Sequence, residues 1–184
     1  MRVDKANKKK EEYRNTGYMK QRVVTVCILF SALVAAISCS SIDCPLNSLV
    51  YTQYGLLNPT GSQDTLRDTL TISTLRADGN DSVLINRDYN ITQFSLPISY
   101  AGDKDVFFFE LQRADESFST LDTVTVYKEN TPHFESVDCA PTFFHTITDV
   151  TCTTNAIDSI SINNPDVNYD TSKKHFNIYF KHNN

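Results

Sequence analysis

The segment Phe176-Asn177-Ile178-Tyr179-Phe180-Lys181 carries the clearest structural pattern in the sequence. Its large apolar residues recur at every second position, so Phe176, Ile178 and Phe180 share one face of an extended strand. Asn177 and Lys181 belong to the opposite face. This alternation predicts a β-strand with one face in a core and the other toward solvent.

Similar patterns recur along the chain, separated by turn residues. The predicted strands cover residues 48–56, 69–75, 82–86, 92–100, 106–111, 122–128, 143–153, 158–163 and 176–181. Residues 106–111 are apolar on both faces until Glu110, which favours a central strand over an edge strand. Residues 40–184 show no helical period of apolar residues. Eight or nine short strands predict an all-β fold, a two-sheet antiparallel β-sandwich that is immunoglobulin-like in general architecture.

An uncharged, mostly apolar stretch covers residues 23–38, directly after Lys20 and Arg22. It is shorter than the roughly 20 residues that a transmembrane helix needs, and its length is typical of a secretory signal. Residues 36–39, Ala-Ile-Ser-Cys, resemble a lipobox in which Ala36 replaces the usual leucine. We therefore expect cleavage before Cys39 and lipidation of Cys39. The alternative is an uncleaved anchor with an incidental cysteine.

The predicted organisation is a signal segment at 1–38, a lipidated tether at 39–46 and a β-sandwich domain at 47–184. Met19 begins a compact basic segment, Met-Lys-Gln-Arg, and is a candidate for the true start. Residues 40–43 lack an acidic cluster of the kind that directs surface export. We therefore expect a lipid anchor in the outer membrane, with the periplasmic face favoured over the cell surface.

Charge is distributed unevenly along the chain, whose net value is −5. Residues 1–38 hold 8 of the 17 basic and 3 of the 22 acidic residues, which leaves 9 basic and 19 acidic residues, a net charge of −10, in the remainder. An acidic domain lacks the basic footprint that nucleic-acid binding requires. The same acidity argues against docking of the folded part on anionic lipid.

Five cysteines occur, of which Cys27 lies in the predicted signal segment and Cys39 is the predicted site of lipidation. Cys44, Cys139 and Cys152 remain, and three pairings are possible in an oxidising compartment. Cys152 falls on the inward-facing parity of its predicted strand, whereas the other two lie in irregular segments. We therefore favour Cys44–Cys139, whose loop of about 95 residues is worth up to about 4–5 kcal/mol in the chain-entropy model. None of the three has zinc-ligand spacing, so we expect no metal site.

No catalytic or cofactor motif is found in the sequence. His133 and His145 flank Cys139 and could form a nucleophile pair with it, but a disulfide would consume that cysteine. Asp78-Gly79-Asn80-Asp81 offers oxygen ligands suited to calcium, yet it is also a good hairpin turn, which is the favoured interpretation. We assign no catalytic, cofactor-binding or metal-binding residue.

A short pattern recurs in which Asp precedes Thr or Ser and an aliphatic residue. Asp closing a turn before a β-residue explains this pattern as the entry to a strand. It also resembles the O-glycosylation acceptor of exported Bacteroidota proteins. The candidate acceptors are Thr65, Thr69, Ser82, Thr123 and Ser159.

Several short motifs occur in a fixed order: CPL at 44–46, HFESVDC at 133–139, FHTI at 144–147, IDSI at 157–160 and VNYD at 167–170. With the lipobox, they resemble a family of Bacteroidota exported lipoproteins classed as a domain of unknown function. The resemblance covers most of 39–184 and implies a small exported β-rich protein. It transfers no catalytic residue, and it agrees with the pairing of Cys44 with Cys139.

Together these patterns predict a membrane-anchored extracytoplasmic lipoprotein that serves as a non-enzymatic binding or assembly module of the bacterial envelope. Its expected partners are the membrane, through the lipid, and an envelope protein or glycan, with no nucleic acid and no cofactor. The alternatives are a small hydrolase acting on envelope or dietary polymer and a cation-binding module. A hydrolase should show a concave site with converging carboxylates or a histidine of perturbed pKa, and a binder an exposed aromatic or apolar patch.

Overall fold

The computed structural model describes residues 22, 25, 44, 49–75, 79–113, 115 and 117–181. Of the predicted signal segment and tether, the structure describes only residues 22, 25 and 44, so Met19 and Cys39 lie outside the described residues. Asp78 lies outside them as well. The chain divides into two compact units, Met1–Asp43 and Cys44–Asn184, and the second holds all the strands described below. Among the described residues, no helix has the length and apolar composition that crossing a membrane requires.

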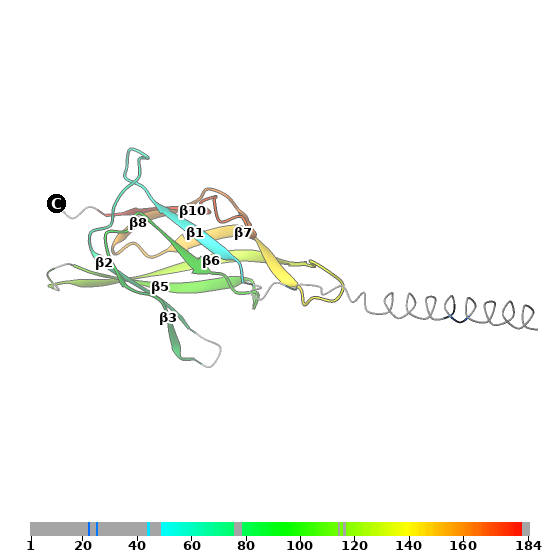
Figure 1. Ribbon diagram of the computed structural model, residues 1–184. Coiled ribbons are helices and arrows are strands. Elements are labelled where there is room, and N and C mark those ends of the chain that lie inside the picture. Colours follow the sequence, from blue (N-terminus) through cyan, green and yellow to red (C-terminus); the bar gives the residue numbers. More distant parts are fainter. Residues whose placement is uncertain are drawn as a thin grey trace, which may run out of the picture. The chain divides into compact units, whose positions relative to one another are not determined.

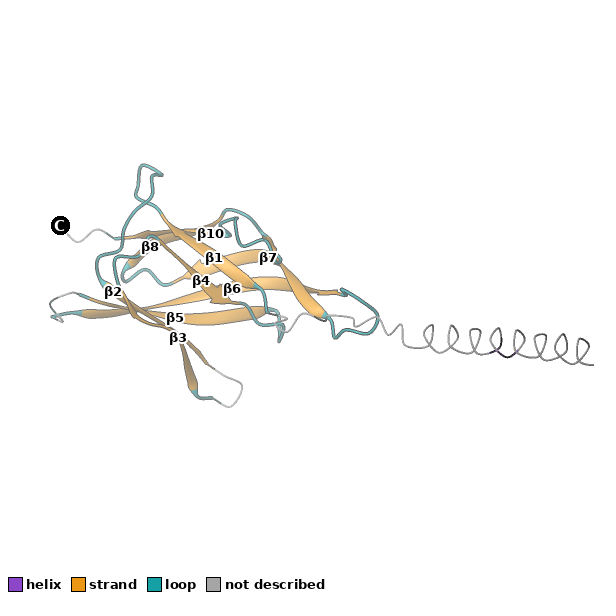
Figure 2. Ribbon diagram, viewed as in Figure 1, coloured by secondary structure: helices purple, strands orange, loops and turns teal. Residues whose placement is uncertain are grey.

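The described part of the second unit forms ten strands in two packed sheets, which confirms the all-β sandwich (Figure 1). Figure 2 shows loops, and no helix, between the strands of this part. The strands are β1 (Tyr51–Leu56), β2 (Thr69–Leu75), β3 (Asp81–Asp88), β4 (Gln93–Pro97), β5 (Lys104–Gln112), β6 (Ser119–His133), β7 (Thr142–Cys152), β8 (Ile157–Ile162), β9 (Asp166–Val167) and β10 (Phe176–Phe180). One sheet has the order β4-β1-β10-β8 and the other β3-β2-β5-β6-β7-β9.

The strands follow the predicted ones closely, and the largest difference is the length of β6. Residues 122–128 were predicted, but the strand runs from Ser119 to His133 and includes Pro132. The pairing of β6 with β5 ends at Tyr127, and the residues beyond it pair only with β7. Lys128 directs its N–H away from β7, to the carbonyl oxygen of Asp103. Pro132 lies at the same parity in the strand, so its missing N–H does not interrupt the pairing with β7.

Two features of the topology are not visible in the sequence pattern. β1 and β10 run parallel, with Tyr54 opposite Phe176, whereas the other described strand pairs are antiparallel, as predicted for the sandwich. Alternation of side chains is the same in both directions and therefore carries no information on strand polarity. β9 lies between the predicted strands at 158–163 and 176–181, and its two residues pair with His145 and Thr146 of β7. A strand of this length is too short to produce a pattern in the sequence.

Aromatic rings fill the space between the two sheets. The ring of Tyr54 stacks between those of Phe94 and Phe176, with centroids 4.8 Å away on each side. These residues belong to the neighbouring strands β1, β4 and β10. Phe109 of β5, in the opposite sheet, meets Tyr54 and Phe94 edge-on at 6.4 and 5.9 Å. All four rings are buried, so this cluster joins the two layers.

The predicted alternation in the last strand is confirmed. Phe176, Ile178 and Phe180 are buried, Lys181 is exposed, and Asn177 is half-buried. β5 lies between β2 and β6, as predicted for a strand that is apolar on both faces. The burial pattern of the sequence therefore identifies both the inner face and the central position.

Asp122 in β6 holds the connection between β7 and β8. Its buried carboxylate accepts hydrogen bonds of 2.7–2.9 Å from the hydroxyl of Thr153 and the backbone N–H groups of Asn155, Ala156 and Ile157. Burial alone would raise the pKa of Asp122, but these hydrogen bonds outweigh it and lower the pKa below its usual value. The carboxylate therefore accepts the hydrogen bonds of loop N–H groups that would otherwise have no backbone carbonyl as a partner.

His175, which precedes β10, connects the two sheets. Its Nδ1 accepts a hydrogen bond of 2.8 Å from the backbone N–H of Gln53 in β1, and its Nε2 lies 3.2 Å from the carbonyl oxygen of Asp166 in β9. The first bond makes Nδ1 an acceptor, so Nε2 carries the proton and donates. Burial lowers the pKa of His175, which favours this neutral form.

The packing of β10 leads to a test of the core. Phe176→Ala should lower the free energy of unfolding by about 3–5 kcal/mol, because it removes a fully buried ring from the aromatic cluster. Tyr179→Ala removes a ring of similar size from the half-buried outer face and should cost clearly less. Denaturant unfolding of both variants measures the difference. Equal costs would show that the outer face of β10 is as buried as the inner one.

Candidate functional site

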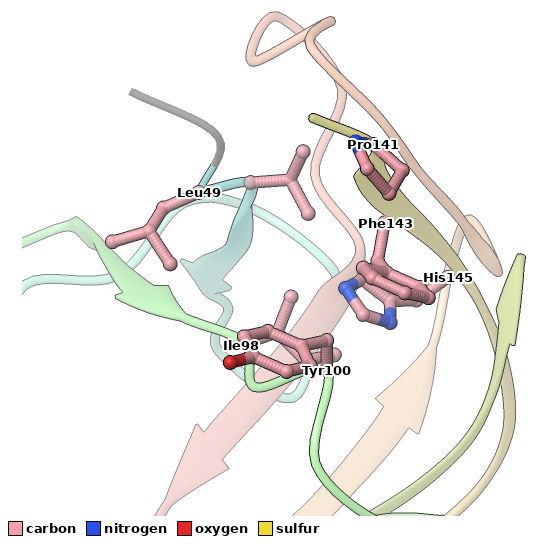
Figure 3. Close-up of a pocket in the computed structure, with 7 residues that line it drawn as sticks. Leu49, Ile98, Tyr100, Pro141, Phe143 and His145 are labelled. Atoms are coloured by element: carbon pink, nitrogen blue, oxygen red, sulfur yellow. The ribbon is translucent and has the colours of Figure 1, made fainter. Parts of the chain in front are cut away.

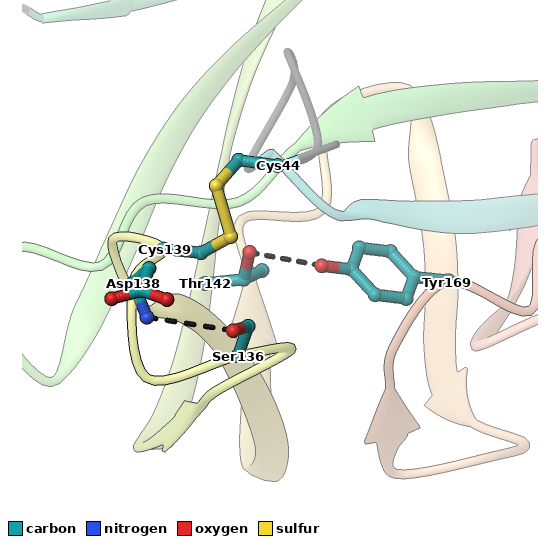
Figure 4. The surroundings of a disulfide bond; sticks show 6 residues. All are labelled: Cys44, Ser136, Asp138, Cys139, Thr142 and Tyr169. Atoms are coloured by element: carbon teal, nitrogen blue, oxygen red, sulfur yellow. Dashed lines mark hydrogen bonds between the residues drawn. A yellow bond between two sulfur atoms is a disulfide. The ribbon is translucent and has the colours of Figure 1, made fainter. Parts of the chain in front are cut away.

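A disulfide between Cys44 and Cys139 connects the start of the described domain to the loop between β6 and β7 (Figure 4). The Cα atoms of the two cysteines are 5.5 Å apart, and 95 residues separate them in the sequence. The favoured pairing is thereby confirmed. We call the part of the sandwich around this bond, where β6 ends and β7 begins, the disulfide end.

The loop between β6 and β7 exposes apolar side chains. Phe134 is 62 % exposed and Val137 is 97 % exposed, although Cys139 in the same loop is buried. Behind the loop, the ring of His133 stacks on Phe144 with centroids 4.2 Å apart. We call residues 134–141 the hairpin loop; it presents apolar side chains to solvent next to a covalently fixed point.

A pocket of about 280 Å³ lies at the same end (Figure 3). Its lining residues are Leu49, Val50, Ile98, Tyr100, Pro141, Phe143 and His145. Tyr100 is 65 % exposed, and its ring stacks on Phe143 with centroids 5.3 Å apart and planes 18° apart. Val50 and Ile98 are buried and form the inner wall. Most of the side chains that line the pocket are therefore apolar, and an aromatic pair with an exposed tyrosine belongs to the lining.

Hydrogen bonds fix His145 and the loop that carries Tyr100. The amide nitrogen of Asn130 donates to the carbonyl oxygens of Tyr100 and Gly102 at 3.2 and 2.6 Å. Its amide oxygen lies 2.7 Å from His145 Nδ1, which must therefore be the donor. The Nε2 atom of the neutral ring is left as an acceptor.

A buried ion pair lies near the pocket. Lys128 Nζ is 3.0 Å from Asp105 Oδ2, with side-chain exposures of 0 % and 13 %. Burial raises the pKa of Asp105 and outweighs the opposing effect of the Lys128 ammonium group. Burial, followed by the positive charge of Lys128, lowers the pKa of His145 to about 4. The imidazole is therefore neutral near pH 7.

The structure removes the proposed cysteine–histidine nucleophile pair, since Cys139 is bonded to Cys44. His133 instead lies 3.2 Å from a carboxylate oxygen of Glu135. Asp81 is the first residue of β3 and lies opposite Leu75, so the described part of the motif, residues 79–81, belongs to the connection between β2 and β3 and the start of β3. Within the described ranges, no three His, Cys, Asp or Glu side chains gather closely enough to hold a metal ion.

The candidate O-glycosylation residues are spread over several strands and loops. Thr65 and Ser159 are exposed, whereas Thr69, Ser82 and Thr123 are half-buried. The carboxylate before Thr123 is the buried Asp122 that holds the β7–β8 loop. Cys39, the candidate lipidation residue, lies outside the described residues.

Lys128, Asp105 and Tyr100 were not predicted as site residues. Lys128 could have been found, because it shares the inward parity of Val124 and Val126 in β6. Tyr100 ends the predicted strand at 92–100 and Asp105 precedes the one at 106–111, and only the arrangement of the sheets brings them to β6 and β7. Cys152 is half-buried and packs against the core, as its parity predicted.

The lowered pKa of His145 leads to a prediction for stability against pH. An unfolded histidine binds a proton near pH 6.5, whereas folded His145 does so only near pH 4. The unfolded chain therefore binds more protons in this window, and stability should fall by up to about 2–3 kcal/mol as the pH decreases through it. His145→Gln keeps a hydrogen-bonding group without this titration and should flatten the profile in urea unfolding.

His175 also has a lowered pKa, so the His145→Gln profile should retain part of its slope. A variant profile as steep as that of the wild type would contradict the role given to His145.

Comparison with known proteins gives one match. No curated protein and no solved structure matches the chain. The profile of a family of unknown function, DUF6452, matches residues 69–180, more than half of the chain. This range runs from the first residue of β2 to the last residue of β10, and it includes the hairpin loop but neither β1 nor Cys44. The chain therefore belongs to the DUF6452 family.

Proposed function

We propose that the chain is an exported lipoprotein of a Bacteroidota envelope, anchored by lipid on Cys39, and that its sandwich is a non-enzymatic binding module. The apolar stretch at 23–38 and the lipobox-like residues before Cys39 support export and lipidation. The disulfide supports an oxidising compartment. The anchor lies in the outer membrane on its periplasmic face, because residues 40–43 carry no acidic export cluster.

The observation that carries the binding role is the aromatic pair of Tyr100 and Phe143 in the lining of the pocket. An exposed tyrosine that stacks on a second ring is held in place before a partner arrives, so binding costs little side-chain entropy. The hydrogen bonds of Asn130 to the Tyr100 loop add to this rigidity. Tyrosines of this kind are typical anchors of protein interfaces.

A protein segment with an apolar side chain fits this pocket better than a glycan. A sugar needs several polar groups for its hydroxyls, and among the described residues of the lining the polar side chains are those of Tyr100 and His145. The volume of about 280 Å³ is small for a whole ligand and suits one or two side chains. The partner is accordingly an envelope protein.

His145 is the one observation that favours the alternative, a small hydrolase, because it has a perturbed pKa and lines a pocket. A general base works best when its pKa lies near the working pH, and a pKa of about 4 makes it a weak base at neutrality. Cys139 is consumed by the disulfide, and none of the described residues that line the pocket carries a carboxylate. Binding therefore explains the pocket better than hydrolysis.

O-glycosylation of the mature domain is part of the proposal. A transferase must reach the acceptor hydroxyl, so exposure favours Thr65 and Ser159 over the half-buried Thr69, Ser82 and Thr123. Both favoured residues follow an aspartate and precede an aliphatic residue.

Anchoring is tested by substitution of the lipobox cysteine. Cys39→Ala should abolish incorporation of labelled fatty acid and leave an uncleaved precursor, because the thiol is the site of lipid attachment. Cys27→Ala, which changes the other leader cysteine, should retain both labelling and cleavage. Fatty-acid labelling and intact mass measure the result. Label on the Cys39→Ala protein would refute the proposed anchor.

The binding role is tested by photo-crosslinking in cells. A photoreactive residue at Tyr100 should give a discrete adduct with an envelope protein, and Phe143→Ala in the same chain should weaken the adduct by removing the stacking partner. Tyr89 is the matched control, because it is also 65 % exposed but lies beyond the end of β3. Equal adducts at both positions, or none at Tyr100, would contradict a binding site at the pocket.

A further inference from the structure

The disulfide fixes how far the folded domain can lie from the lipidated residue. Cys44 follows Cys39 by five residues, which span at most about 17 Å when fully extended. Cys44 is bonded to Cys139, with 5.5 Å between the two Cα atoms. Without this bond, the first buried residue after Cys39 that the structure describes is Val50, and the intervening segment would reach about 38 Å.

The disulfide connects the tether to the hairpin loop, because Cys139 belongs to that loop. Val137 lies two residues before Cys139, and its side chain is almost entirely exposed. Phe134, in the same loop, exposes more than half of its surface. A lipid anchor keeps the nearest part of a domain close to the bilayer. Large apolar side chains exposed on that part can therefore reach the membrane interface.

We propose that the hairpin loop inserts Phe134 and Val137 into the interface of the membrane that holds the lipid on Cys39. This proposal rests on the lipid anchor of the proposed function. The loop also carries Glu135 and Asp138, both exposed, so contact with the bilayer depends on the apolar side chains and not on attraction to anionic headgroups. Zwitterionic lipid is the matching surface.

The opposite end of the sandwich provides an internal comparison. Phe118 precedes β6, as Phe134 follows it, and is 54 % exposed. The 15 residues of β6 separate the two phenylalanines by about 50 Å. The tether cannot hold both ends at the bilayer, because Cys44 is bonded beside only one of them.

Tryptophan fluorescence distinguishes the two ends, since the sequence contains no tryptophan. The full-length lipoprotein, with Phe134→Trp, Val137→Trp or Phe118→Trp as its only tryptophan, is reconstituted into phosphatidylcholine vesicles with brominated acyl chains. Phe134→Trp and Val137→Trp should be quenched several-fold more strongly than Phe118→Trp. Quenching at the loop should persist at high salt. Two loop positions are used so that a fault in one variant does not decide the result.

Vesicle flotation separates failure of this inference from failure of the anchor. Protein that floats with the vesicles but shows equal quenching at all three positions, or none, retains the anchor and overturns insertion of the loop. A blue shift at Phe134→Trp without quenching by bromine would indicate contact with protein and would also overturn it. Protein that does not float overturns the lipid anchor and, with it, insertion of the loop.

Discussion

The stacking of Tyr54 between Phe94 and Phe176 is the interaction on which the arrangement of the sandwich depends. These three rings come from adjacent strands, and their inner side is closed by Phe109 of the other sheet. The stack therefore holds β4, β1 and β10 side by side in the four-stranded sheet, and its contact with Phe109 sets the spacing to the six-stranded sheet. Tyr54 lies in β1, which begins directly after Val50, so the stack also positions this buried residue of the pocket wall.

β6 adds a second constraint, which is electrostatic. Asp122 and Lys128 are both buried on its inner face, with Val124 and Val126 between them. Each charge has its partners on other segments: the β7–β8 loop for Asp122 and Asp105 of β5 for Lys128. A shift of β6 by two residues would keep the same face inward but would leave a buried charge without its partner, which is costly. The charges thus specify the register that the valines alone would leave free.

The sequence could predict whatever depends on local alternation. The buried face of β10, the central position of β5 and the inward side of Cys152 all follow from residues at every second position. The pairing of Cys44 with Cys139 was predicted because both lie in irregular segments, whereas Cys152 lies on the inward face of a strand. What could not be predicted depends on which strands become neighbours.

The parallel pairing of β1 with β10, the two-residue β9 and the pocket all belong to this second group. Tyr100 and Phe143 meet although 43 residues separate them. Their contact depends on the return of β7 beside β6 and on the loop before β5, and neither leaves a pattern in the sequence. Lys128 is the exception, since its parity with two buried valines was visible.

The parallel contact between β1 and β10 also determines when the fold can be completed. The four-stranded sheet cannot be completed before β10, the last strand in the sequence, is present. Tyr54 and its partner Phe176 are more than a hundred residues apart in the sequence. Contacts of such long range form slowly, because a large loop must be closed before any of its stabilisation is gained. A polypeptide that is threaded unfolded through a translocation channel benefits from this delay. For the export proposed above, the late pairing of β10 with β1 would delay closure of the sandwich until nearly the whole domain has been delivered.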